Sequence, residues 1–158
     1  MKDKIFIFGG GILIILAIVG AAVFLSKGQD KATDISKDQI VASNGIHWHP
    51  KLNVYINGEK QEFENNIGLG AIHQPMHTHD EDFKDGVVHM EMSGVVTKDD
   101  TKLGNFFKIW GKEFNSTQIF DKKSGEDGQI TMAVNGKENK DFENYQMRDG
   151  DKIEIRYE

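Results

Sequence analysis

The spacing of hydrophobic positions changes several times along the chain, and each spacing predicts a different kind of segment. Residues 5–25 are apolar and carry no charge, a run long enough to cross a bilayer core as a helix. Residues 26–43 are polar and without an apolar period, as is typical of a linker. We therefore expect a cytoplasmic N-terminus at 1–4, a transmembrane anchor at 5–25, a flexible linker at 26–43 and a folded domain at 44–158.

Alternation of apolar and polar residues within 44–158 predicts β-strands. The clearest stretches are 52–56, 87–92, 130–134 and 153–157. Asn-Gly follows two of them, at 57–58 and 135–136, and this dipeptide is the strongest short signal for a hairpin. We expect about six or seven strands, by the same reasoning from pattern.

One stretch has helical spacing instead. Apolar residues recur at i, i+3, i+4 and i+7 from Leu103 to Trp110, which places them on one face of a helix. Residues 99–101 supply N-cap candidates, and Gly111 suits the helix end. Residues 115–128 are expected to form a long loop with one short strand at 117–120. The predicted fold class is α+β, a mainly antiparallel sheet with one main packed helix.

Charge and composition narrow the location and the partners. The net charge is −6, and Lys2 and Lys4 against Asp3 contribute +1, so the rest carries −7. Such an acidic surface argues against a nucleic-acid partner. The lysines before the apolar run predict a single-pass protein of the cell membrane with its C-terminal domain outside the cytoplasm. A cleaved signal peptide is the alternative, although its apolar region is usually only about 7–15 residues.

All six histidines lie between residues 47 and 89. They include two H-x-H pairs, and side chains two residues apart share one face of a strand. Because imidazole is a common metal ligand, we expect rings from separate segments to meet around one ion. The candidate ligands are His47, His49, His77, His79 and His89, with the last four the first choice.

Four further residues could bind the ion or support its ligands, namely Asp80, Glu91, His73 and Met76. Glu91 shares the predicted strand face of His89, and Asp80 could accept a hydrogen bond from an imidazole. Met90 and Met92 alternate with Val88 and are expected in the core. The acidic stretch 80–86 does not fit a calcium-binding loop, because its glycine comes one position late.

The absence of cysteine excludes disulfides and thiolate ligands. Nitrogen and oxygen ligands suit a copper or zinc ion, with some room for iron and nickel. Copper is favoured over zinc, because copper(II) ranks above zinc in the general affinity order and thiol buffers do not compete outside the cytoplasm.

Several motifs together carry a resemblance. The early H-x-H pair, HTHD at 77–80, GVVHME at 86–91 and LGNFFKIWG at 103–111 resemble a family of small membrane-anchored or secreted archaeal and bacterial proteins, largely described as uncharacterised. The resemblance covers about residues 44–158 and implies a histidine site without a reaction. The C-terminal part resembles a β-grasp fold but lacks the terminal diglycine of sulfur carriers. The H-x-H pairs are also similar to cupin motifs, but Phe83 stands where a glutamate is expected.

Three functions follow from this reading. The first is a membrane-anchored, extracytoplasmic histidine-rich protein for metal capture, delivery or sensing. The second is a small metalloenzyme, a hydrolase or oxidoreductase in which Glu91 or Asp80 is the acid or base. The third is an interaction domain whose histidines are incidental or sense pH. No nucleophile elbow, phosphate loop or zinc-protease motif is present, so binding is favoured over catalysis.

Overall fold

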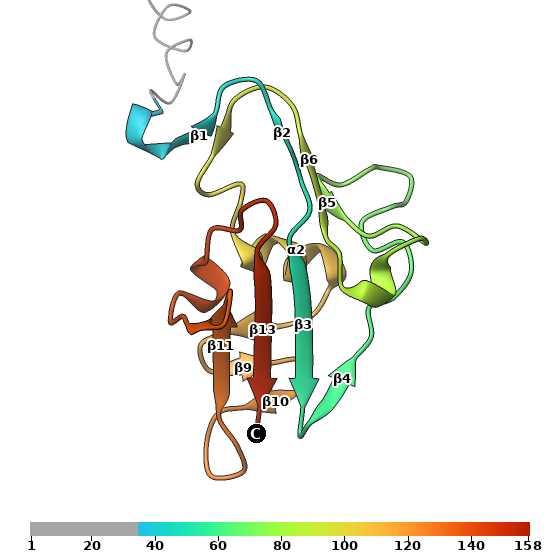
Figure 1. Cartoon of the computed structure of the whole chain (residues 1–158), viewed down its shortest axis with the longest axis vertical. Helices are drawn as coiled ribbons and strands as arrows, with labels where there is room; N and C mark the ends of the chain where they lie inside the picture. The colour runs from blue at the N-terminus through green and yellow to red at the C-terminus, as the bar shows by residue number, and fades with distance from the viewer. Residues whose placement is uncertain (1–34) are drawn as a thin grey trace, which may run out of the picture. The chain divides into compact units, whose positions relative to one another are not determined.

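A computed structural model describes residues 35–158 (Figure 1). The chain divides into two compact units, 1–36 and 37–158, and the helices and strands of the described residues belong to the second. The predicted anchor at 5–25 lies outside the described residues. Within 35–158, no helix is both long enough and apolar enough to span a membrane.

The larger sheet has five strands in the order β12-β11-β13-β3-β4. These strands are β12 (Lys137–Glu138), β11 (Ile130–Val134), β13 (Lys152–Tyr157), β3 (Lys51–Ile56) and β4 (Glu59–Gln61). β13 and β3 lie side by side and run parallel, whereas the other neighbours are antiparallel (Figure 1). The prediction of a mainly antiparallel sheet with one main helix is confirmed for the described residues.

Both predicted Asn-Gly turns are present. Asn57 and Asn135 have φ angles of 51° and 52°, and the glycines that follow have φ angles of 82° and 78°. Positive φ at both central residues is the requirement of the tight hairpin turn that matches the twist of the strands. The turns join β3 to β4 and β11 to β12.

A second, three-stranded sheet has the order β2-β6-β5 and is antiparallel throughout. Its strands are β2 (Ile46–Trp48), β6 (His89–Met92) and β5 (Met76–His77). Cross-strand partners are His47 with Glu91 and His77 with His89. Because side chains alternate along a strand, this register places all four side chains on the same face of the sheet.

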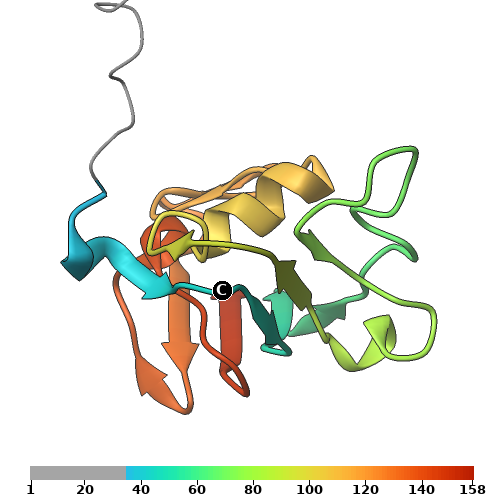
Figure 2. The same cartoon turned by 90° about the horizontal axis from the view of Figure 1, so that it is seen from above.

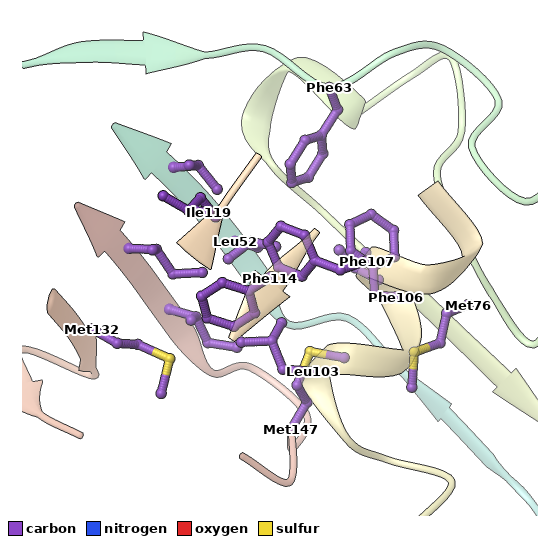
Figure 3. Close-up of a cluster of buried hydrophobic side chains, with 14 of the residues drawn as sticks. Leu52, Phe63, Met76, Leu103, Phe106, Phe107, Phe114, Ile119, Met132 and Met147 are labelled. Atoms are coloured by element: carbon purple, nitrogen blue, oxygen red, sulfur yellow. The ribbon is translucent and has the colours of Figure 1, made fainter. Parts of the chain in front are cut away.

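The helix α2 (Leu103–Trp110) lies across one side of the strands (Figure 2). Leu103, Phe106 and Phe107 are at most 1% exposed, as the helical spacing predicts. Figure 3 shows these residues in the core, where the rings of Phe107 and Phe114 stack with centroids 4.5 Å apart. The helix ends at Gly111, which has the left-handed conformation expected of a C-cap glycine.

The predicted N-cap is wrong. The residue in the N-cap position is Lys102, and its side chain makes no capping hydrogen bond. The carboxylate of Asp100 is already engaged one turn earlier, where Oδ2 accepts hydrogen bonds from the backbone N and Oγ1 of Thr97 at 2.7 and 2.6 Å. This local turn competes with the helix for the acidic side chain.

Two stretches expected to be irregular contain strands. Residues 114–123 form a small sheet of β8 (Phe114–Asn115), β9 (Gln118–Ile119) and β10 (Lys122–Lys123), where one strand was predicted. η1 (Lys37–Gln39) and β1 (Ile40–Ala42) lie in the stretch assigned to the linker, and β1 pairs with β7 (Val96–Thr97). The compact unit therefore begins before the expected boundary at Asn44. Two 3₁₀ turns, η2 (Phe83–Asp85) and η3 (Phe142–Asn144), complete the elements.

Candidate metal centre

The six histidine rings form a connected series along one face of the β2-β6-β5 sheet. His47 and His49 come from β2 and the residue after it, His89 from β6, and the remaining three from β5 and its flanks. Ring centroids of successive members lie 4.3 to 4.8 Å apart, in the order 47, 49, 89, 79, 77, 73. The sheet register therefore brings together histidines that are up to 42 residues apart in sequence, counting from 47 to 89.

The opposite face of this sheet belongs to the core. Val88 and Met90 are fully buried there and Met92 is partly buried, as their alternation predicts. Met76 pairs with Met90 across the sheet and is also fully buried in the hydrophobic cluster. Its thioether is therefore a core group, and Met76 does not lie on the face that carries the rings.

His77 is the most enclosed of the rings, with no exposed surface. Its Nδ1 lies 3.1 Å from the carbonyl oxygen of Gln74. A carbonyl can only accept, so neutral His77 carries its proton on Nδ1 and leaves a lone pair on Nε2. Burial lowers the pKa of His77; the Gln74 carbonyl opposes this effect and His73 and His79 add to it. The ring is therefore neutral near pH 7, the form that binds metals.

Asp82 determines the tautomer of His89 in the same way. The Nε2 of His89 lies 3.0 and 3.2 Å from the two carboxylate oxygens of Asp82. An ionised carboxylate only accepts, so Nε2 carries the proton and the lone pair of neutral His89 is on Nδ1. Hydrogen bonds of this kind orient metal-binding imidazoles and raise their basicity.

The carboxylate in this role is Asp82 rather than Asp80, which the sequence suggested. Asp80 is exposed and belongs to neither group of potential ligands among the described residues. The turn η2 brings Asp82 back toward β6, and Gly86 ends that turn with a φ of 78°. A side chain at Gly86 would collide with the carbonyl oxygen of Leu52, so this return depends on glycine.

Two groups of side chains place their ligand atoms within 4.8 Å of one another. The inner group consists of His77, His79, His89 and Glu91, and the outer group consists of His47, His49 and His89. In the inner group, Nε2 of His77 lies 3.1 Å from Nε2 of His79. Two nitrogens bound to one tetrahedral ion at about 2.0–2.1 Å would be about 3.3 Å apart, so the spacing fits a metal. Three imidazoles and one carboxylate also form a donor set that suits zinc or copper.

The outer group is held by contacts with two acidic residues. Nε2 of His47 lies 3.2 Å from Oε1 of Glu91, its partner across the sheet. The backbone N of His49 donates to Oδ1 of Asp149 at 2.8 Å. Asp149 stands 100 residues from His49 in the chain, and no spacing in the sequence indicated this contact.

His73 belongs to neither group but touches the inner one. Its Nε2 lies 3.2 Å from both ring nitrogens of His77. His73 and Glu91 also line a cavity of about 420 Å³, whose other walls include Val95 and Ile109. The site therefore lies next to a space large enough for a small molecule.

The predicted residues thus separate into three sets. Three of the four favoured rings, His77, His79 and His89, meet in one group that also contains Glu91, and His49 joins His89 and His47 in another. Asp80, Met76 and His73 lie outside both groups. Comparisons of this chain with protein-family models, with curated proteins and with solved structures found no match.

Proposed function

We propose that the domain binds one transition-metal ion through His77, His79, His89 and Glu91, for metal capture, delivery or sensing. The observation that carries this proposal is the convergence of these four ligand atoms within 4.8 Å from β5, its C-terminal flank and β6. The tautomers of His77 and His89 support it, because their protons are engaged by Gln74 and Asp82 and their lone pairs remain available.

We favour copper over zinc as the ion. The ligands are nitrogen and oxygen atoms only, and copper(II) ranks above zinc for such donors. The proposed place of the domain, outside the cytoplasm on a single anchor at 5–25, supports the same choice because thiol buffers are scarce there. The uncharged length of that run and the lysines before it support the anchor.

We also propose that the main sheet has a β-grasp arrangement. The strand order β12-β11-β13-β3-β4, with β13 parallel to β3 at its centre and α2 packed against it, supports this likeness. The likeness concerns the scaffold alone, because a fold of this kind does not imply a reaction. The family resemblance of the histidine motifs is likewise a proposal.

The proposal is tested by metal titration of the full chain, purified in detergent without a histidine tag. We expect one copper(II) per chain by calorimetry and elemental analysis. His79→Ala and Glu91→Gln each remove a proposed ligand, so each should weaken binding by at least the roughly 10–100-fold that loss of a supporting group causes at other metal sites. Asp80→Asn is the matched control and should bind as the wild type does. If the chain bound neither copper nor zinc, the proposed metal site would be wrong, and the remaining hypothesis would be an interaction domain with incidental histidines.

A metalloenzyme is the second candidate, because the cavity of about 420 Å³ beside Glu91 and His73 could admit a small substrate. Glu91 would then accept or deliver a proton instead of closing the coordination shell. Water-proton relaxation of the copper-loaded protein distinguishes the two functions. An exchangeable water on the ion favours the enzyme, and a closed shell favours capture and delivery.

A further inference from the structure

We infer that the outer group is an exposed transfer position for the same ion that the inner group holds, and that His89 passes the ion between them. This inference rests on the proposed function, since it needs an inner group that binds metal. It adds a second binding position, assigns a route by which the ion arrives and leaves, and predicts that the two positions are never filled together.

The first step of the argument is the central position of His89. Its ring centroid lies 4.8 Å from that of His49 on one side and 4.4 Å from that of His79 on the other. His89 is the residue common to the two groups of potential ligands found among residues 35–158. An ion can therefore move from one group to the other without leaving the reach of this ring.

The second step is that His89 has one lone pair to offer. Its Nε2 is engaged by Asp82 at 3.0 Å, so Nδ1 is the available nitrogen. A ring that uses a single nitrogen binds one ion at a time. The two groups therefore compete for His89. When an ion in one group is bound to His89, the other group lacks this ligand.

The third step is the difference in charge and exposure between the groups. The outer group has imidazoles alone, and the side chains of His47 and His49 are 63% and 43% exposed. The inner group has the carboxylate of Glu91 and the buried ring of His77. A carboxylate offsets part of the charge of a divalent cation, so the ion rests in the inner group and meets solvent in the outer one.

Glu91 connects the two positions as well. Its Oε1 lies 3.2 Å from Nε2 of His47, although Glu91 belongs to the inner group and His47 to the outer. Glu91 has a second carboxylate oxygen, so it can bind an ion in the inner group while Oε1 stays in contact with His47. The contact therefore keeps an outer ligand next to an inner one.

The experiment measures stoichiometry and exchange rates in the tag-free full chain. Copper(II) is loaded in a stopped-flow instrument and then removed with excess EDTA. The wild type should bind one copper(II) per chain. His47→Ala/His49→Ala should also bind one, but with loading and release about tenfold slower, which corresponds to about 1.4 kcal/mol in each barrier. His79→Ala/Glu91→Gln should retain a weaker, rapidly released ion on the outer group.

Each outcome decides between the possibilities. Two copper(II) ions per wild-type chain at saturation, or unchanged rates in His47→Ala/His49→Ala, would overturn the transfer position and leave the inner site standing. An absence of copper binding in the wild type would overturn both proposals. Because His47 and His49 are exposed, their substitution should leave the near-ultraviolet circular dichroism unchanged. The pair His47→Gln/His49→Gln repeats the test with side chains that keep the surface polar.

Discussion

The carboxylate of Asp82 lies 3.0 Å from Nε2 of His89, and this contact selects the ring nitrogen that His89 can offer to an ion. The pair is partly sheltered, with side chains 13% and 30% exposed for His89 and Asp82. The contact is made across the turn η2, so an exposed surface turn controls the chemistry of a strand residue.

Asp82→Asn should weaken copper binding by about 10–100-fold, as loss of such supporting carboxylates does elsewhere. The amide can still accept a hydrogen bond from Nε2, but it no longer supplies the negative charge that makes the ring a stronger ligand. Competition titration against a chelator of known affinity measures the effect. Asp80→Asn is the control in the same turn, and equal losses in the two variants would contradict the assigned role of Asp82.

The stability of the metal-free protein should fall as the pH is lowered through about 6.5, the ordinary pKa of histidine. Burial lowers the pKa of His77 in the folded state, so below pH 6.5 the unfolded chain binds a proton that the folded chain does not. The unfolding free energy therefore falls until the pH reaches the lowered folded pKa. Urea denaturation at several pH values measures this slope, and His77→Gln should reduce it. An unchanged slope in that variant would refute the assignment.

Asp151→Ala should lower the unfolding free energy by about 2–4 kcal/mol, because three partly buried hydrogen bonds lose their charged acceptor. Asp151 is 6% exposed, and its carboxylate accepts hydrogen bonds from Tyr145 Oη, the Arg148 backbone N and Asn135 Nδ2. Burial raises the pKa of Tyr145, and the hydrogen bond from its hydroxyl to Asp151 raises it further. Chemical denaturation measures the loss, and the exposed Asp127→Ala is the control. A loss below about 0.5 kcal/mol would show that the network is dispensable.

Phe106→Ala should cost about 3–5 kcal/mol of stability, because the ring is fully buried between α2 and the sheet. Ile72→Ala is a matched truncation at a side chain that is 73% exposed, and it should change stability by no more than about 0.5 kcal/mol. Thermal denaturation followed by circular dichroism compares the two. Similar effects would contradict the position of Phe106 in the core.

Periodicity in the sequence was sufficient for the long elements and insufficient for the short ones. The stretches around β3, β11 and β13 are five or six residues long and alternate clearly. β8, β9 and β10 have two residues each, too few to show any period. β1 has three residues, all apolar, at the end of a polar stretch, so it too is short for a period to show, and its pairing with β7 identifies it as a strand.

In the site, too, features that depend on neighbouring residues were predicted from the sequence, whereas contacts between distant residues were not. The H-x-H spacing indicated neighbouring rings, and the ring centroids of the two pairs lie 4.7 and 4.8 Å apart, although His49 and His79 stand beyond the ends of β2 and β5. The choice of Asp82 over Asp80 depended on the path of η2, which alternation does not describe. The contact of Asp149 with His49 joins segments 100 residues apart and arises from the tertiary fold alone.

β2 passes into β3 through only His49 and Pro50, so one extended segment belongs to both sheets. Backbone hydrogen bonds continue across this junction, from Val88 N to Pro50 O and from Leu52 N to Gly86 O. An ion bound by His47 and His49 would therefore restrain β3, which lies inside the five-stranded sheet beside β13. Slower amide hydrogen exchange along β3 would report occupancy of the outer group from a distance.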